Sequence, residues 1–241
     1  MVRITLNKPM PEIPDPVVIT AVKYGLLYNH PAITDTRKIT SSDDWFVVTN
    51  AVRDLLRDLA GGYSLAGKEL KETGNVYWFS QGSTTNSLKF NARGGGQRLF
   101  DGTFSYLRIN GYYHTQDLNP TYPLPGYDTQ CSYRFAYNTT VMTYYSSTPI
   151  KYGLSIRLCR LNNGMAHLSE GYYTGNNGLS YRTIAIEVLP GTVYEFLADN
   201  LCETKYRNGD TIPEVTNNAA WAALSTGALC AYNNDWSNVL I

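Results

Sequence analysis

The residues best suited to specific contacts are tyrosines gathered in one segment, residues 110–149. This segment holds eight tyrosines but only three charged residues, Asp117, Asp128 and Arg134. Tyrosine offers amphipathic contact area at low entropic cost, and its ring face can stack on a sugar ring. The segment therefore predicts a surface that binds a glycan or a protein, although a long loop covering a sheet with half-buried tyrosines would have the same composition. The residues that we expect to contact the ligand are Tyr112, Tyr113, His114, Asp117, Tyr122, Tyr127, Asp128 and Tyr133.

Catalysis has little support in the sequence. The three histidines, His30, His114 and His167, are isolated from one another, and the G-x-S-x-G motif of a serine nucleophile is absent. Residues 94–96 are three glycines, but the Lys-Ser/Thr of a phosphate-binding loop does not follow, so we interpret them as a tight turn. No pair of acids stands out as the carboxylates of a glycosidase. We therefore predict a protein that is not an enzyme and has no cofactor.

Metal sites are not expected either. The four cysteines, at positions 131, 159, 202 and 230, form no C-x-x-C pair, which argues against zinc and favours buried free thiols. Residues 208–210 and 233–235 are rich in Asn and Asp, the residue types that supply oxygen ligands to calcium. Both stretches contain too few acids for such a site, and Asn and Asp also form turns by bonding the local backbone. Turns are the preferred interpretation.

Composition describes a soluble, self-contained domain. The 241 residues are 43% hydrophobic and 17% charged, and 20 basic and 20 acidic side chains cancel. A balanced charge argues against nucleic-acid binding, which normally needs a basic excess. No apolar run approaches the roughly 20 residues of a membrane span, so we expect no membrane insertion. No signal peptide is visible at the start, which favours a virion protein released by lysis over a secreted surface protein.

Helix and strand signals are unevenly distributed. Prolines dominate residues 1–16, which we interpret as an extended arm preceding a single domain over residues 17–241. The main helix is expected to open at Ser41-Ser42-Asp43-Asp44, to follow a 3.6-residue apolar period to Leu59 and to end at Gly61-Gly62. Shorter helices are expected over residues 64–72 and 218–224, and strands over residues 17–22, 88–92, 104–109, 133–137, 152–158 and 182–188. Few helices with many short strands indicate the α+β class.

Seven short motifs follow one another between residues 44 and 159. They are Asp44-Trp45, Gly61-Gly62, Ala66–Gly74, Trp78, Phe90–Arg98, Asp101–Phe104 and Gly153–Cys159. Their order resembles the Fibrobacter succinogenes major paralogous domain, a family common in surface proteins of Bacteroidetes.

The order of the remaining motifs departs from that family. The family's usual opening motifs come last here, in residues 198–213 and 221–234, whereas residues 24–29, which normally follow them, come first. The usual order would run from Asn238 directly into Tyr24. The chain therefore resembles a circular permutant in which residues 181–241 correspond to the family's N-terminal part. Alternatively, those residues complete the domain of a neighbouring chain by swapping.

The resemblance implies a C-type-lectin-like α+β fold with one main helix, one or two short helices, small antiparallel sheets and long loops. Such a fold is used mainly for binding, although fold alone does not settle function. We expect a receptor-binding protein, such as a phage fibre tip, that recognises a glycan or protein on a bacterial cell from a virion surface or the extracellular space. The alternative is a structural virion or assembly protein, a homo-oligomer (trimer or swapped) that binds no host ligand. Residues 110–147 also occupy the place where retroelements diversify some phage adhesins, although a loop of fixed sequence, with tyrosines chosen for packing, is the preferred interpretation.

Overall fold

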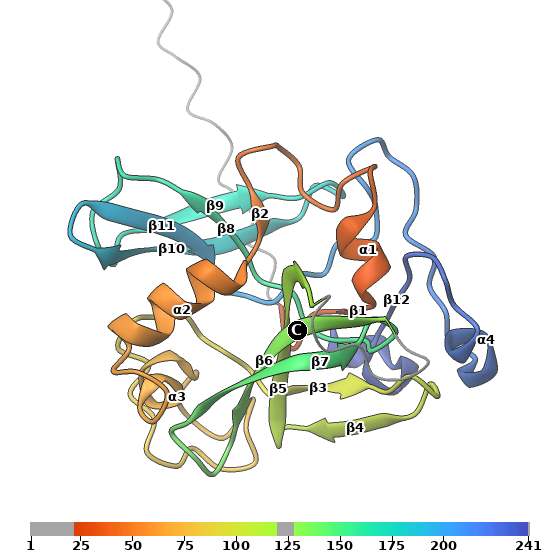
Figure 1. Cartoon of the computed structure of the whole chain (residues 1–241), viewed down its shortest axis with the longest axis horizontal. Coiled ribbons are helices and arrows are strands. Elements are labelled where there is room, and N and C mark those ends of the chain that lie inside the picture. Colours follow the sequence, from red (N-terminus) through yellow and green to blue (C-terminus); the bar gives the residue numbers. More distant parts are fainter. Residues whose placement is uncertain (1–21, 120–127, 241) are drawn as a thin grey trace, which may run out of the picture.

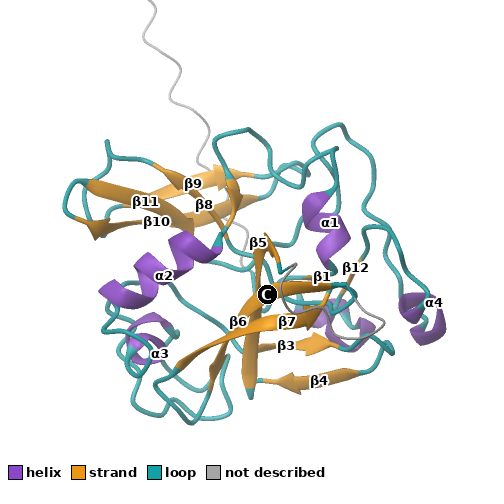
Figure 2. Ribbon diagram, in the orientation of Figure 1, coloured by secondary structure: helices purple, strands orange, loops and turns teal. Residues whose placement is uncertain are grey.

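Three sheets form the framework of the chain in the computed structural model, which describes residues 22–119 and 128–240 (Figures 1 and 2). The first sheet has the order β2-β8-β11-β10-β9 and is antiparallel throughout. The second has the order β4-β3-β5-β6-β7 and is antiparallel except between β3 and β5, and the third pairs β1 with β12. The strands are β1 (Leu27–Tyr28), β2 (Phe46–Val47), β3 (Gly95–Arg98), β4 (Phe104–Leu107), β5 (Asn110–Leu118), β6 (Thr129–Ala136), β7 (Met142–Pro149), β8 (Leu158–Leu161), β9 (Glu170–Thr174), β10 (Ser180–Leu189), β11 (Thr192–Leu197) and β12 (Leu229–Cys230).

Four short α-helices lie among the described residues, and the longest of them, α2, has 10 residues. They are α1 (His30–Thr34), α2 (Asn50–Leu59), α3 (Ala66–Leu70) and α4 (Asn218–Ala222), and two 3-10 turns, η1 (Tyr232–Asn234) and η2 (Trp236–Asn238), follow β12. Figure 1 shows α2 between the two large sheets. Its residues Val52 and Leu56 belong to the same buried cluster as Ile184 of β10 and Tyr113 of β5. This helix therefore joins the sheets into one core.

The expected C-type-lectin-like α+β fold is wrong. The described residues are mostly β, arranged in three sheets, and no single helix dominates among them. The reason is that the helical signals in the sequence are local and each produces one short element. Segments interpreted as loops instead pair with strands far away in the chain, as Phe46 pairs with Cys159.

The predicted main helix begins later than expected. Thr49, not the Ser41–Asp44 stretch, is the N-cap of α2, and its side chain accepts a hydrogen bond from the Val52 N–H. Residues 46–47 are instead the strand β2, because their pairing with β8 outweighs the helical period. The C-terminal end is confirmed, since α2 ends at Leu59 and Gly61 and Gly62 have φ of 90° and 78°. The two shorter helices are confirmed in reduced form as α3 and α4.

Residues 110–149 are largely regular, contrary to the long-loop interpretation. They form β5, β6 and β7, and their intervening residues 120–127 lie outside the described part of the chain. Along β5 and β6, Tyr113, Tyr133 and Phe135 are buried in the core. Strands are also confirmed within residues 104–109, 133–137 and 182–188. Residues 88–92 form no strand, and within residues 152–158 only Gly153, Leu154 and Ser155 make isolated bridges before β8 begins at Leu158. The predicted arm and all but the last residue of the predicted strand over residues 17–22 lie outside the described residues.

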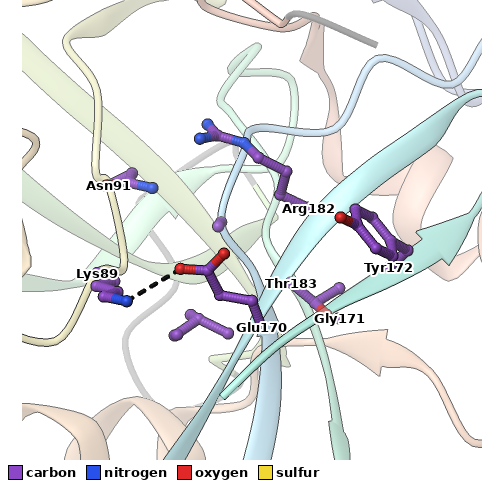
Figure 3. Close-up of a pocket in the computed structure, with 9 residues that line it drawn as sticks. Lys89, Asn91, Glu170, Gly171, Tyr172, Arg182 and Thr183 are labelled. Carbon is purple, nitrogen blue, oxygen red and sulfur yellow. Dashed lines mark hydrogen bonds and ion pairs between the residues drawn. The ribbon is translucent and has the colours of Figure 1, made fainter. Parts of the chain in front are cut away.

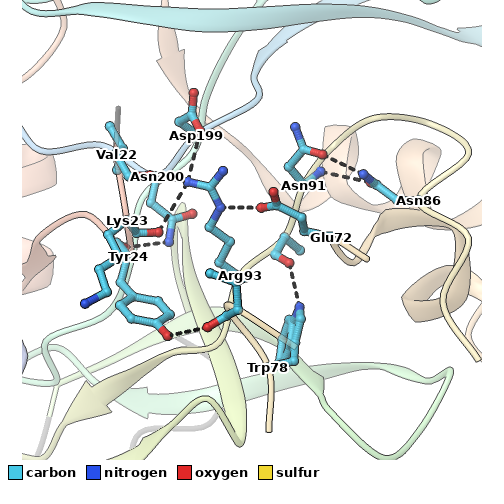
Figure 4. A network of polar contacts seen from close by, with 12 residues as sticks. Val22, Lys23, Tyr24, Glu72, Trp78, Asn86, Asn91, Arg93, Asp199 and Asn200 are labelled. Atoms are coloured by element: carbon cyan, nitrogen blue, oxygen red, sulfur yellow. Dashed lines mark hydrogen bonds and ion pairs between the residues drawn. The ribbon is translucent and has the colours of Figure 1, made fainter. Parts of the chain in front are cut away.

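Several residues from the sequence motifs form a buried polar network, shown in Figure 4. The Arg93 guanidinium lies between the carboxylates of Glu72 and Asp199, 3.0 Å from the latter, and also donates to the carbonyl oxygen of Val22. Its side chain is 2% exposed, so these contacts replace water almost entirely. Removing one partner of such a buried pair costs about 3–5 kcal/mol. These motif residues therefore hold the core together.

A second buried guanidinium, that of Arg157, is bonded to no carboxylate within residues 22–119 and 128–240. Arg157, with 0% exposure, donates to the side-chain oxygen of Asn200 at 2.8 Å. It also donates to the carbonyl oxygens of Phe90, Asn91 and Leu197 at 2.6–2.8 Å. Burial lowers the pKa of Arg157, but four oxygen acceptors hold its charge. One side chain thus ties the middle of the chain to its last quarter.

The last quarter of the chain packs on its own first residues. Leu27 of β1 pairs with Cys230 of β12, and Val22 forms an isolated bridge with Leu240. Residues 181–240 therefore pack against residues 22–28 of the same chain.

Candidate functional site

An aromatic groove lies on the face of the second sheet that points away from the core. Its volume is about 390 Å³. Side chains alternate between the two faces of a strand, so Tyr112 faces the groove while its neighbour Tyr113 is buried. The nine lining residues, which define the aromatic groove below, are Gln97, Phe100, Tyr112, Ser132, Tyr145, Ser147, Thr148, Pro149 and Tyr152.

Four rings surround the groove, two from the strands β5 and β7 and two from loops. Tyr112 of β5 and Tyr145 of β7 have ring centroids 6.5 Å apart across β6. The rings of Phe100 and Tyr152 stack with their planes 21° apart and centroids separated by 6.2 Å. Next to this set, Tyr106 is 50% exposed and its centroid lies 6.3 Å from that of Tyr112. The groove thus presents several aromatic faces within the reach of one ligand.

Apart from Pro149, the remaining lining residues are polar and uncharged. The Ser132 and Thr148 hydroxyls are 2.7 Å apart and bond to each other, and the Gln97 amide donates to Ser105 Oγ at 3.3 Å. Burial raises the pKa of Tyr112, so its phenol is neutral at physiological pH. Among the described residues that line the groove there is no nucleophile–base pair and no carboxylate. Its chemistry is therefore stacking and hydrogen bonding.

Three of the expected contact residues are buried and offer no surface to a ligand. Tyr113 and Tyr133 are 0% and 1% exposed, and their rings stack on each other with centroids 5.2 Å apart. The Tyr113 hydroxyl donates to the carbonyl oxygen of Arg93 at 2.9 Å and accepts from its N–H at 2.7 Å. These residues are core, because inward-facing positions of β5 and β6 must fill the space beneath α2.

His114 is buried for a different reason, since β1 and α1 cover its end of β5. Its Nε2 lies 2.6 Å from the carbonyl oxygen of Tyr28, and its Nδ1 lies 2.7 Å from Gln130 Oε1. A neutral imidazole has only one N–H, which Tyr28 accepts. Exchanging the oxygen and nitrogen positions of the Gln130 side-chain amide lets its Nε2 donate to His114 Nδ1. This orientation also gives a partner to the Gln130 Nε2, which otherwise has none among the described residues. Burial lowers the pKa of His114 to about 3, consistent with the neutral ring.

The other expected contact residues are dispersed. Asp117 accepts a hydrogen bond from the N–H of Asn50 at the start of α2, which is a structural role. Asp128 is exposed and lines a different cavity, together with His30 of α1. Tyr122 and Tyr127 lie outside the described residues. Of the six expected contact residues that the structure describes, only Tyr112 lines the aromatic groove.

Most of the residues that line the groove were not among the expected contact residues. Tyr145 lies within the tyrosine-rich segment but was not selected, and Phe100 and Tyr152 lie outside that segment. A period of two along residues 142–149 would have placed Tyr145 and Ser147 on one face of a strand. Nothing local marks Phe100 and Tyr152, because they meet only through the fold.

Several predictions about metal-ligand and thiol chemistry can be checked directly. Residues 208–210 form a turn in which the Asn208 side chain accepts from the Asp210 N–H, and residues 233–234 adopt positive φ within η1. All four cysteines are free and buried, as predicted. His30 and His114, distant in sequence, have ring centroids 6.0 Å apart, but both are buried. Within residues 22–119 and 128–240, no three His, Cys, Asp or Glu side chains gather as a metal site would require.

Comparison with known proteins adds no relative. No family model matches the chain, and no curated protein or solved structure matches it. Among the described residues, none of the helices has the length and apolar character needed to cross a bilayer.

Proposed function

We propose that this chain is a surface-recognition module that binds an uncharged glycan of a bacterial cell in the aromatic groove. The observation that carries the proposal is the set of four rings around a cleft without charged side chains. Aromatic faces stack against the C–H faces of sugars, and the surrounding hydroxyls and amide fix the orientation of the ring. A cleft of about 390 Å³ is large enough for a short stretch of a polysaccharide.

The uncharged lining favours a neutral glycan over a protein receptor. Protein interfaces are enriched in arginine as well as aromatic residues, and their rims usually carry charges. The sheet pairs Tyr112 with Arg134, which is not among the residues that line the groove; the Arg134 guanidinium lies 5.5 Å from the centroid of the Tyr145 ring and donates to the Thr143 hydroxyl. Such a receptor requires the module to act outside its own cell or on a virion surface.

We also propose that the chain is related to the Fibrobacter succinogenes major paralogous domain through the permuted order of its sequence motifs, and not through the C-type-lectin-like fold. Its support is that Asn238 and Tyr24, which the family order would join, are hydrogen-bonded neighbours here. The motif residues Arg93 and Arg157 have structural roles. The family resemblance therefore does not locate the ligand site.

Glycan-array and whole-cell binding test the proposal. Tyr145→Ala and Tyr152→Ala each remove one ring from the groove and should weaken binding about tenfold, since a stacking contact contributes about 1 kcal/mol beyond its buried area. The matched control is Tyr63→Ala, because Tyr63 is 57% exposed and lies outside the groove. Circular dichroism confirms that each variant is folded.

Two outcomes contradict the proposal. Undiminished binding by both groove variants would place the ligand elsewhere. If the wild-type chain binds no glycan on the array and no bacterial cell, the alternative of a structural assembly protein is favoured.

A further inference from the structure

A second cavity lies on the first sheet, whereas the aromatic groove lies on the second. Its volume is about 270 Å³, and β9, β10 and the loop around Lys89 form its walls (Figure 3). Unlike the groove, it is lined by charged side chains. Its lining residues are Lys89, Asn91, Glu170, Gly171, Tyr172, Arg182, Thr183, Ile184 and Ala198.

Two N–H donors are fixed at this cavity by bonds to groups behind it. Arg182 donates from Nε and one Nη to the buried Asp199 carboxylate at 2.9 and 2.7 Å, and its other Nη has no acceptor among the described residues. The Asn91 side-chain oxygen accepts from Asn86, which leaves the Asn91 amide nitrogen without an acceptor in the described part of the chain. Figure 3 shows the side chains of Asn91 and Arg182 around the cavity together with that of Glu170. Donors held in advance bind an acceptor at a small entropic cost.

A third donor is held by a bond that a ligand can replace. Lys89 Nζ lies 3.0 Å from Glu170 Oε1, and the two side chains are 51% and 71% exposed. Exposed pairs of this kind contribute little, because water screens them and ordering two long side chains is unfavourable. An anion entering the cavity therefore competes with Glu170 for Lys89 on nearly equal terms.

The charges around the cavity favour an anion. Two cations, Lys89 and Arg182, and one carboxylate, Glu170, line the cavity, and the Asp199 carboxylate is bonded to Arg182 behind it. Burial alone would raise the pKa of Asp199, but the hydrogen bond from Arg182 and the charges of Arg93 and Arg157 lower it. The one wall suited to a ring is Tyr172, which is 53% exposed.

We infer that this cavity binds a carboxylate-bearing ligand the size of one sugar ring, with its carboxylate bonded by Arg182, Asn91 and Lys89 and its ring against Tyr172. The volume of the cavity excludes longer ligands from its interior. A free acidic monosaccharide and the terminal unit of an acidic polysaccharide present the same chemistry. This site is separate from the aromatic groove, so either can fail without the other.

Titration of the whole chain with D-glucuronate, D-glucose and trigalacturonate, followed by amide NMR shifts, tests the inference. We expect glucuronate to shift the signals of residues 170–172 and 182–184, glucose to leave them unchanged, and raised salt to weaken the effect. Lys89→Met should weaken glucuronate binding about threefold, whereas Glu170→Gln should strengthen it about threefold, because each removes one side of an exposed charge pair. Both side chains are exposed, so neither variant should impair folding.

The opposite signs of the two variants make the test decisive. Equal shifts with glucose and glucuronate, no shifts with any of the three compounds, or effects of the same sign in both variants would each overturn the inference. Tighter binding of trigalacturonate than of glucuronate would assign the site to a polysaccharide end, and the reverse would assign it to the free sugar. The Tyr145→Ala variant of the aromatic groove serves as a control and should bind glucuronate as the wild type does.

Discussion

The backbone N–H of Tyr24 donates a hydrogen bond to the carbonyl oxygen of Asn238 at 3.0 Å. On either side of this bond, the Lys23 N–H donates to the Val239 carbonyl oxygen at 2.8 Å and Val22 is bridged to Leu240. The first and last described residues are therefore neighbours. Nearly the whole chain lies between them in sequence.

This neighbourhood predicts that the chain tolerates a new order of its segments. A permuted chain would start at Gly191, run to Leu240, continue through a linker of about four residues into Val22 and end at Pro190. The opening falls in the exposed turn between β10 and β11, whose strands can still pair. We expect a cooperative thermal transition within about 10 °C of the original, measured by calorimetry.

A permutant opened inside β6, between Tyr133 and Arg134, is the matched control. It divides the strand that lies between β5 and β7 and should not fold. Equal behaviour of the two permutants would contradict the prediction.

Acid should destabilise the protein through His114 and His30. Burial lowers their pKa values to about 3 and about 4 from the ordinary value of 6.5. In the unfolded chain both protonate as the pH falls through about 6.5, but in the folded chain they stay neutral. The free energy of unfolding is therefore unaffected by these histidines above about pH 6.5. As the pH falls below that value, it decreases by up to about 1.4 kcal/mol per pH unit for each histidine, until the pKa of the folded state is reached.

Urea unfolding at pH 7, 6 and 5 measures this slope. The His114→Gln variant should lose about half of it, even if its stability at pH 7 is lower. Comparison with the wild type cancels the carboxylates, which both proteins share. An unchanged slope in the variant would show that His114 titrates normally in the folded protein.

How far the sequence predicts this structure depends on the range of the interactions involved. The end of α2 was predictable because Gly61 and Gly62 act on their own backbone. Its start was not, because residues 46–47 pair with β8, which lies more than a hundred residues further along the chain. The serine and acids before them serve other contacts, such as the ion pair between Asp44 and Arg160.

The candidate site follows the same rule. Tyrosine content marked residues 110–149, which form three strands of the second sheet, but it did not separate the two faces of those strands. Tyr112 and Tyr113 were therefore selected together, although Tyr112 lines the groove and Tyr113 is buried in the core. His114 gave no local sign of burial, since Tyr28 approaches it from β1. Phe100 and Tyr152 adjoin the groove through loops whose contact no local pattern encodes.

Lys71 should be essential for stability. Its Nζ donates to the carbonyl oxygens of Ala136 and Thr139, each at 2.7 Å, and the residue is 2% exposed. Burial lowers the pKa of Lys71 to about 8, yet these carbonyls keep a charged donor in place. Lys71→Met leaves both acceptors unpaired and should cost about 2–4 kcal/mol of unfolding free energy.

Chemical denaturation of Lys71→Met beside Lys68→Met checks this expectation. Lys68 lies within α3, and Lys71 is the C-cap of the same helix. The Lys68 side chain is 40% exposed, so its replacement should cost less than about 0.5 kcal/mol of unfolding free energy. Similar losses in the two variants would mean that the carbonyls around Lys71 find other partners.

Gly175→Ala should destabilise the protein through Glu203. A Cβ at residue 175 would lie 1.9 Å from Glu203 Oε1. That carboxylate is buried and accepts from the Tyr181 hydroxyl at 2.6 Å and the Asn177 N–H at 2.8 Å, so it cannot move without losing both bonds. We expect a loss of about 1–3 kcal/mol.

Gly164→Ala is the control for this change. A Cβ there meets only Asn162 Oδ1, at 3.7 Å, which is ordinary contact. Its melting temperature should stay within about 2 °C of the wild type, whereas that of Gly175→Ala should fall by several degrees. If Gly175→Ala melts with the wild type, the Glu203 carboxylate has room that the structure does not show.

The pairing of β1 with β12 also determines when folding can finish. Leu27 and Tyr28 are made about two hundred residues before their partners Cys230 and Leu229. Closing so long a loop is entropically unfavourable and slow, and it cannot begin while the partner strand is missing. Until then the apolar surface that β12 will cover stays open to other chains. Yield in the cell should therefore depend on how soon β12 follows β1 out of the ribosome and on chaperones that protect β1 in the meantime.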